Sequence, residues 1–146
     1  MSQTANAGLE QVKPGDSIVG IHESDLITPV DVIQRLLATG RMPVAGWPVL
    51  MADDGTELFY DTFAYRADGQ RFTNEPPYHP RVRTEPFQVD SVGSCWLMHA
   101  EDIRRGLRCR TRAVLDLCAD MRQAGRTFWV DPSIRVIQPK DLWVQW

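Results

Sequence analysis

Two acidic side chains stand one residue apart, directly after a short apolar run. In GIHESDLITP, residues 20–29, Glu23 and Asp25 follow the apolar segment SIVGI. Carboxylate oxygens are hard ligands, and a pair of them can hold Mg²⁺ or Mn²⁺ against the oxygens of a phosphate group. Short acidic motifs are also common in turns that have no binding role. The motif therefore predicts either a metal and phosphate site at the end of a strand or an acidic turn before a helix.

Other polar residues also follow apolar segments. Asp61 in FYDT and Asp90 in VDSVGS each come at the end of a predicted strand. The histidines, His22, His79 and His99, are scattered and lack the spacing of a metal motif. His22 lies beside the acidic pair, but a partly buried histidine with a backbone partner explains it more simply. The five arginines between residues 104 and 112 are better explained by a solvated helix face than by phosphate binding.

The predicted secondary structure must position these residues. SIVGI, residues 17–21, is typical of a buried strand in a parallel sheet, so the acidic pair is expected at the C-terminal end of that strand. TPVDVIQRLLATG, residues 28–40, predicts a helix with Thr28 as N-cap and Pro29 in the first turn. Its predicted inner face consists of Ile33, Leu36 and Leu37.

Strands and helices alternate along the rest of the chain, which predicts an α/β architecture. A short helix is expected at 7–12, further strands at 42–50, 57–66 and 94–99, helices at 100–107 and 111–125, and closing strands at 127–130 and 134–139 around a DPS turn. The segment 66–86 contains four prolines and little periodicity. A loop of this length in a compact domain is more often functional or mobile than idle, so we expect it to lie over a site.

Composition limits the possible classes of protein. The chain has 146 residues, 43% of them hydrophobic and 24% charged, which suits one globular domain. Its 16 basic and 19 acidic residues give a net charge of −3, so it lacks the basic surplus of a dedicated nucleic-acid binder. The cysteines, Cys95, Cys109 and Cys118, have no C-x-x-C spacing and no signal segment precedes them. We therefore expect reduced thiols, a cytoplasmic setting and no transmembrane segment.

The order of these segments resembles the GT-A fold of nucleotide-sugar glycosyltransferases, in family 2 and its relatives. There, a helix similar to ANAGLE precedes GD, an apolar strand and an Asp-x-Asp motif, and residues 5–26 follow this layout with the acidic pair at the motif. DLCADMRQAGRTFWVDPSIRVIQP, residues 116–139, resembles the closing helix and strands of that family. FYDTFAYRADGQRF at 59–72 and SCW at 94–96 resemble the capsule-associated mannosyltransferases and their relatives.

This resemblance implies a GT-A-like α/β fold with a mixed, mostly parallel sheet and flanking helices, and a nucleotide-sugar donor. The implied metal ligands for Mn²⁺ or Mg²⁺ are Glu23 and Asp25, the implied donor or acceptor contacts are Asp61, Ser91, Gly93 and Trp96, and the candidate catalytic residues are Asp116 and Asp90. Trp96 could stack on a sugar ring. The structural alternatives are a core position for Trp96 and a turn-capping role for Asp90.

Two positions depart from the family's pattern. Relatives place a carboxylate base near the start of the closing helix, where this chain has Ala113, Val114 and Leu115. Asp116 is the nearest carboxylate, but an ion pair with Arg112 one turn away explains it more simply. Relatives often carry a histidine ligand after the last strand, where this chain has Gln138, whose neutral amide oxygen is a weaker ligand.

The third departure concerns the beginning of the chain. The sequence starts at the helix before the acidic motif, so residues 1–146 are expected to form one GT-A-like domain truncated at its N-terminus. The first βαβ half, which holds the nucleotide in the family, is then expected from a partner chain or a homo-oligomer that covers the exposed sheet edge. The leading hypothesis is a metal-dependent glycosyltransferase. The alternative is a non-catalytic binding or assembly module that keeps a degenerate glycosyltransferase fold.

Overall fold

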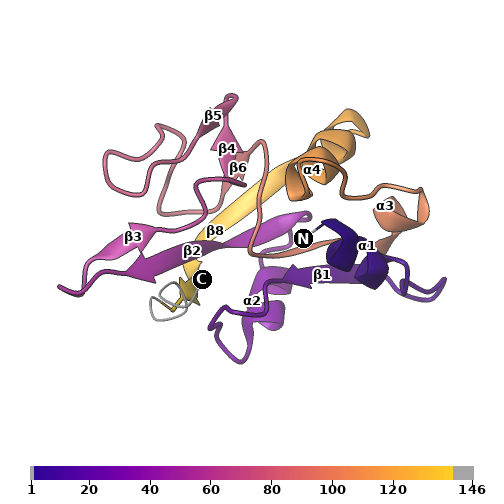
Figure 1. The fold of residues 1–146 in the computed structure, drawn as a ribbon, viewed down its shortest axis with the longest axis horizontal. Helices are drawn as coiled ribbons and strands as arrows, with labels where there is room; N and C mark the ends of the chain where they lie inside the picture. Colours follow the sequence, from indigo (N-terminus) through magenta and orange to yellow (C-terminus); the bar gives the residue numbers. More distant parts are fainter. Residues whose placement is uncertain (1, 140–146) are drawn as a thin grey trace.

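The computed structural model describes residues 2–139, which form a mixed α/β fold (Figure 1). In chain order its elements are α1 (Ser2–Leu9), β1 (Ile18–His22), α2 (Val32–Ala38), β2 (Val44–Met51), β3 (Glu57–Phe59), β4 (Arg66–Ala67), β5 (Gln70–Arg71), β6 (Phe87–Val89), β7 (Cys95–His99), α3 (Ala100–Arg104), α4 (Val114–Gln123) and β8 (Phe128–Gln138). The predicted positions of β1, β2, β7, α3 and α4 are confirmed.

The strands of the main sheet run in mixed directions. Its order is β1-β7-β2-β8-β6, with β3 paired to the outer part of β2. Within the described residues β2 and β8 are parallel, and the other pairs of this sheet are antiparallel. The prediction of a mostly parallel sheet is therefore wrong. An apolar run identifies a strand, but the direction of its neighbours depends on segments far away in the sequence, here β7 inserted between β1 and β2.

The closing strand is continuous. The predicted DPS turn at 131–133 lies inside β8, where the pairing with β2 shifts from Gly46↔Asp131 to Trp47↔Arg135. Asp131 Oδ1 accepts hydrogen bonds from the backbone N–H of Ser133 at 2.9 Å and from its hydroxyl at 2.6 Å. The turn signal in the sequence thus produces a bulge in the strand, and the strand does not end there.

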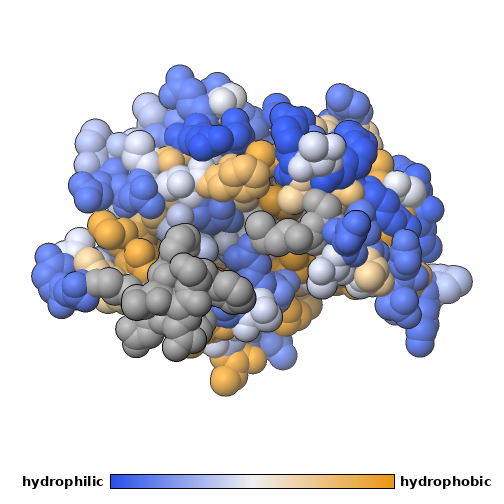
Figure 2. Space-filling view, in the orientation of Figure 1, coloured by the Kyte–Doolittle hydropathy of each residue, from blue (hydrophilic) through white to orange (hydrophobic). Residues whose placement is uncertain are grey.

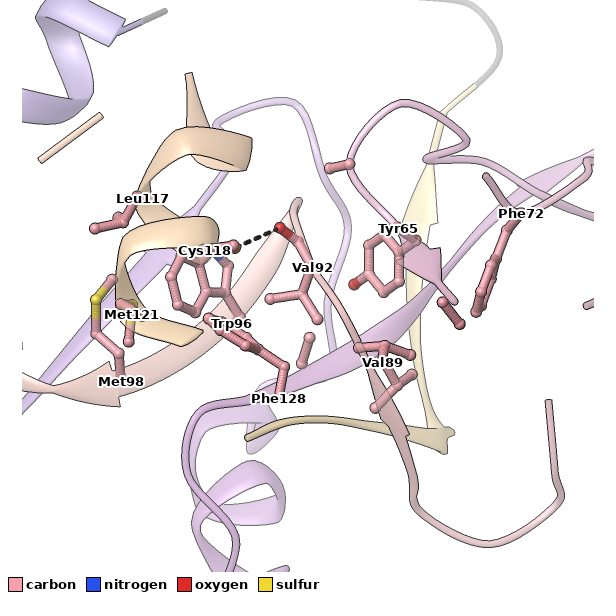
Figure 3. Packing of buried hydrophobic residues seen from close by; sticks show 14 of the residues in the cluster. Tyr65, Phe72, Val89, Val92, Trp96, Met98, Leu117, Cys118, Met121 and Phe128 are labelled. Carbon is pink, nitrogen blue, oxygen red and sulfur yellow. Dashed lines mark hydrogen bonds between the residues drawn. The ribbon is translucent and has the colours of Figure 1, made fainter. Parts of the chain in front are cut away.

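Hydrophobic side chains cover both faces of the sheet. The larger cluster lies between the sheet and α1, α3 and α4, and Figure 3 shows Trp96 and Phe128 packed beside Met98, Leu117 and Met121. The smaller cluster lies under α2 on the opposite face, around Leu36. Cys95, Cys109 and Cys118 are free and buried.

Helix α2 is shorter than predicted, and a different set of its side chains faces the core. It begins at Val32, and its N-cap residue Asp31 makes no side-chain capping hydrogen bond. Val32 and Leu36 face the core, whereas Ile33 and Leu37 are 44% and 40% exposed, so the predicted inner face is correct only at Leu36. Figure 2 shows hydrophobic residues at the surface along α2 and the turn before it.

Candidate functional site: an acidic cluster at the end of β1

The antiparallel pairing of β1 and β7 builds the site. Because the two strands run in opposite directions, the C-terminal end of β1 lies beside the start of β7. The backbone N–H of Glu23 donates to the carbonyl oxygen of Ser94 at 2.9 Å. The Ser94 hydroxyl in turn donates to Asp61 Oδ2 at 2.8 Å. The structure thus brings Glu23 and Asp61 together, 38 positions apart in the sequence, on the two sides of one serine.

The position of Asp61 is set by a tight turn. Its Oδ1 accepts the backbone N–H of Ala64 at 2.9 Å, which holds the carboxylate against its own backbone. A Cβ atom on Gly93 would lie 2.4 Å from Asp61 Oδ2 and 2.6 Å from the Cβ of Ala64. A side chain at position 93 would therefore clash with Asp61, so close packing requires glycine there. Gly93, which was predicted as a binding residue, lies in the wall of the acidic cluster.

The cluster strongly perturbs its ionisable groups. Burial, together with the negative charges of Asp61 and Asp25, raises the pKa of Glu23 from 4.5 to about 7. Burial also raises the pKa of Asp61. Burial and the nearby charge of Glu23 raise the pKa of Tyr60 to about 12. Tyr60 was not predicted as a site residue. Its position directly before Asp61, which was a predicted site residue, was the feature of the sequence that could have identified it.

Asp25 is held by the last residue of β8. Gln138 Nε2 donates to Asp25 Oδ2 at 3.1 Å, and two backbone hydrogen bonds of 2.8 Å between Ile27 and Ile137 fix the segment. Gln138 is 1% exposed, and its Oε1 has no partner among the described residues. A buried amide oxygen without a partner is costly unless a ligand or water satisfies it.

The donor atoms of the cluster are the hard oxygens that Mg²⁺ and Mn²⁺ prefer. Glu23, Asp25 and the amide of Gln138 are the residues that could hold such an ion. Across residues 2–139, no group of three or more His, Cys, Asp or Glu side chains is gathered closely enough to hold one. Two carboxylates and one amide would therefore hold such an ion here. His22 is not one of these candidate ligands, because its Nε2 lies 3.3 Å from Thr28 Oγ1. The partner of His22 is therefore a side chain, whereas a backbone partner was expected from the sequence.

Asp90 and Ser91 have partners outside the cluster. Asp90 accepts the backbone N–H of Gly69 at 2.7 Å and lies 3.3 Å from Arg122 Nη2. It lines a polar groove of about 430 Å³ to which neither the acidic pair nor Asp61 contributes. The hydroxyl of Ser91 is buried and donates to the carbonyl oxygen of Ala64 at 2.5 Å.

Trp96 and Asp116 also have structural roles. Trp96 is fully buried, with its ring 5.8 Å from that of Phe128, which is the core alternative left open by the sequence. Asp116 accepts the backbone N–H of Arg112 at 2.9 Å and its Nε at 2.8 Å. These bonds hold the pKa of Asp116 below its usual value, so it is a weak proton acceptor. The predicted ion pair with Arg112 is confirmed.

Comparison with known proteins provides no family for this chain: no family model matches it, and no curated protein matches its sequence. Within residues 2–139 no helix combines the length and the apolar character needed to cross a lipid bilayer.

Proposed function

We propose that this chain is a glycosyltransferase-like protein that binds a nucleotide-sugar donor through a divalent cation at the acidic cluster. The observation that carries the proposal is the convergence of Glu23, Asp25 and Asp61 with the orphaned amide oxygen of Gln138. Carboxylates with raised pKa values in one place are typical of functional sites, because burying like charges together costs stability.

In this proposal each residue has a defined task. Glu23, Asp25 and Gln138 would hold Mn²⁺ or Mg²⁺, which would supply the positive charge that a donor's diphosphate requires. Asp61, oriented by Ser94 and by its own turn, accepts hydrogen bonds from sugar hydroxyl groups. Glu23 must lose its proton to become a ligand, so cation affinity rises as the pH rises through about 7.

We further propose that the fold is the C-terminal part of a GT-A domain and that a nucleotide-binding half joins it at the open edge of β1. Strand β1 ends the sheet, and its outer edge pairs with no other strand among the described residues. Ile18, in that strand, is 39% exposed. An apolar strand at an open edge favours pairing with a partner chain or with a second copy.

One observation favours the second candidate, a non-catalytic binding or assembly module. The candidate base Asp116 is engaged by Arg112, and residues 113–115, Ala-Val-Leu, occupy the positions where the family that the sequence resembles has a carboxylate. A module of this kind would bind a donor without transferring the sugar. Asp61 is half-buried and its pKa is raised, so beside Glu23 it is the carboxylate of the acidic cluster that could receive a proton.

Calorimetric titration tests the proposal. Wild-type protein is titrated with Mn²⁺ alone and with Mn²⁺ plus UDP- and GDP-sugars, beside Asp25→Ala and the exposed control Glu85→Gln. We expect Asp25→Ala to lose binding, because it removes a ligand and frees the Gln138 amide, while Glu85→Gln binds like the wild type. Equal binding by Asp25→Ala and wild type would show that the acidic pair is only a turn. An assay of sugar transfer by the wild type then distinguishes the two candidates, because a glycosyltransferase transfers the sugar and a binding module does not.

A further inference from the structure

A second groove lies beyond the acidic cluster, at the outer end of the sheet. It has a volume of about 400 Å³, and none of Glu23, Asp25 and Asp61 lines it. Trp47 and Val49 of β2 line it together with Tyr78, Val82 and Arg83 of the loop between β5 and β6, which lies above β3 in Figure 1. Small-molecule sites commonly have volumes of about 300–1,000 Å³. We call it the Trp47 groove.

One wall of the Trp47 groove is apolar and firmly packed. The ring of Tyr78 meets that of Trp47 edge-on at 5.7 Å, and Trp47 also packs on Phe59 at 4.5 Å. Trp47 is only 5% exposed, so the half-buried Tyr78 with Val82 forms most of the accessible apolar surface. A rigid aromatic and aliphatic wall suits the C–H face of a sugar ring, which buries apolar area without losing its hydroxyl contacts.

The other side of the groove is charged. Glu57 Oε2 and Arg135 Nε lie 3.1 Å apart, and their side chains are 45% and 44% exposed. Arg83 also lines the groove, and its Nη1 donates to the backbone oxygens of Val82, at 2.9 Å, and Pro80. No acidic side chain among the described residues forms an ion pair with Arg83. Two arginines and one glutamate therefore give the lining a net charge of +1.

These charges restrict the ligand. A purely apolar molecule would desolvate Glu57 and Arg83 without replacing their hydrogen bonds. A simple anion would satisfy Arg83 but would face the carboxylate of Glu57. A sugar with a carboxylate satisfies both, because its hydroxyl groups donate to Glu57 while its carboxylate accepts a charge-assisted hydrogen bond from Arg83.

We propose that the Trp47 groove binds a sugar ring that carries a carboxylate, of the hexuronic acid class. The C–H face packs on Tyr78, the hydroxyl groups bond to Glu57, and the carboxylate bonds to Arg83. Assigning this sugar to the acceptor of a transfer reaction rests on the proposed function, but its binding in the groove does not.

Saturation-transfer NMR with methyl β-D-glucuronide and methyl β-D-glucoside tests the proposal. Arg83→Gln is compared with Arg81→Gln, its matched control two residues away, because Arg81 pairs with Asp68 and lines the polar groove. We expect wild type and Arg81→Gln to prefer the glucuronide. Arg83→Gln should bind it about tenfold more weakly and lose the preference, as expected for a lost hydrogen bond to a charged group. Circular dichroism checks that both variants are folded.

Three results would overturn the inference: no glucuronide binding by the wild type, equal binding of both glycosides, or unchanged binding by Arg83→Gln. The variant Asp25→Ala separates this inference from the proposed function. It should keep full glucuronide binding, because Asp25 does not line the groove, while it loses binding of Mn²⁺ with nucleotide sugars. A wild type that binds glucuronide but not Mn²⁺ with nucleotide sugars would overturn the proposed function alone. A wild type that binds Mn²⁺ with nucleotide sugars but not glucuronide would overturn this inference alone.

Discussion

Replacing Glu23 with glutamine removes the group whose ionisation costs this fold stability. The pKa of Glu23 rises from 4.5 to about 7, mainly because the side chain is partly buried and then because Asp61 and Asp25 are near. At about 1.36 kcal/mol for each tenfold change in the acid constant, this rise corresponds to about 3 kcal/mol. Solvent screens the partly exposed side chain, so we expect about 2 kcal/mol in practice.

The sign of the effect follows from proton linkage. Below pH 4.5 the carboxyl group is protonated in both the folded and the unfolded chain, so it does not change the free energy of unfolding. Between pH 4.5 and about 7 the unfolded chain releases its proton first, and the free energy of unfolding falls. Above about pH 7 the loss is complete. Glu23→Gln lacks this ionisation, so we expect the variant to be more stable than the wild type by about 2 kcal/mol at pH 8.

Urea denaturation of both proteins at pH 5 and pH 8 measures this difference. At pH 5 we expect the variant to gain less than about 1 kcal/mol, because the wild-type carboxyl group is still mostly protonated in the fold. Glu85→Gln, at an exposed position, is the control and should show no pH-dependent difference. An equal gain at both pH values, or a loss of stability at pH 8, would refute the assignment of a raised pKa to Glu23 in the acidic cluster.

Two further predictions concern residues that support the fold and the site. Asp102 is fully buried and its carboxylate accepts three hydrogen bonds of 2.9–3.1 Å from Arg126, so Arg126→Ala should cost about 3–5 kcal/mol in urea denaturation. Arg126→Lys keeps the charge and should cost less, and similar losses for the two variants would contradict this account. Gly93→Ala forces a Cβ atom into Asp61, so we expect a loss of about 1–3 kcal/mol and weaker Mn²⁺ binding by calorimetry. The control is Gly8→Ala in α1, where a Cβ atom would have no neighbour within 4 Å, and equal effects of the two substitutions would disprove the packing argument.

Local patterns in the sequence were enough to predict several helices and strands and the acidic pair, Glu23 and Asp25, at the end of β1. The apolar run before Glu23 predicted β1, and the helical spacing before Gly125 predicted α4. The ion pair between Asp116 and Arg112 followed from their separation of one helical turn. Each of these features depends on residues within a few positions of one another, where backbone geometry alone determines which side chains meet.

The tertiary structure decided which distant segments meet. β7 lies antiparallel between β1 and β2, so Ser94 and Asp61 reach Glu23, while Asp90 faces a different groove. The same arrangement buries Trp96 in the core. The apolar run of β1 did not reveal the direction of its neighbour, because strand pairing depends on the burial of both faces of the whole sheet. The acidic pair was therefore recognisable from the chain alone, but its third carboxylate and the buried amide of Gln138 depend on non-local packing.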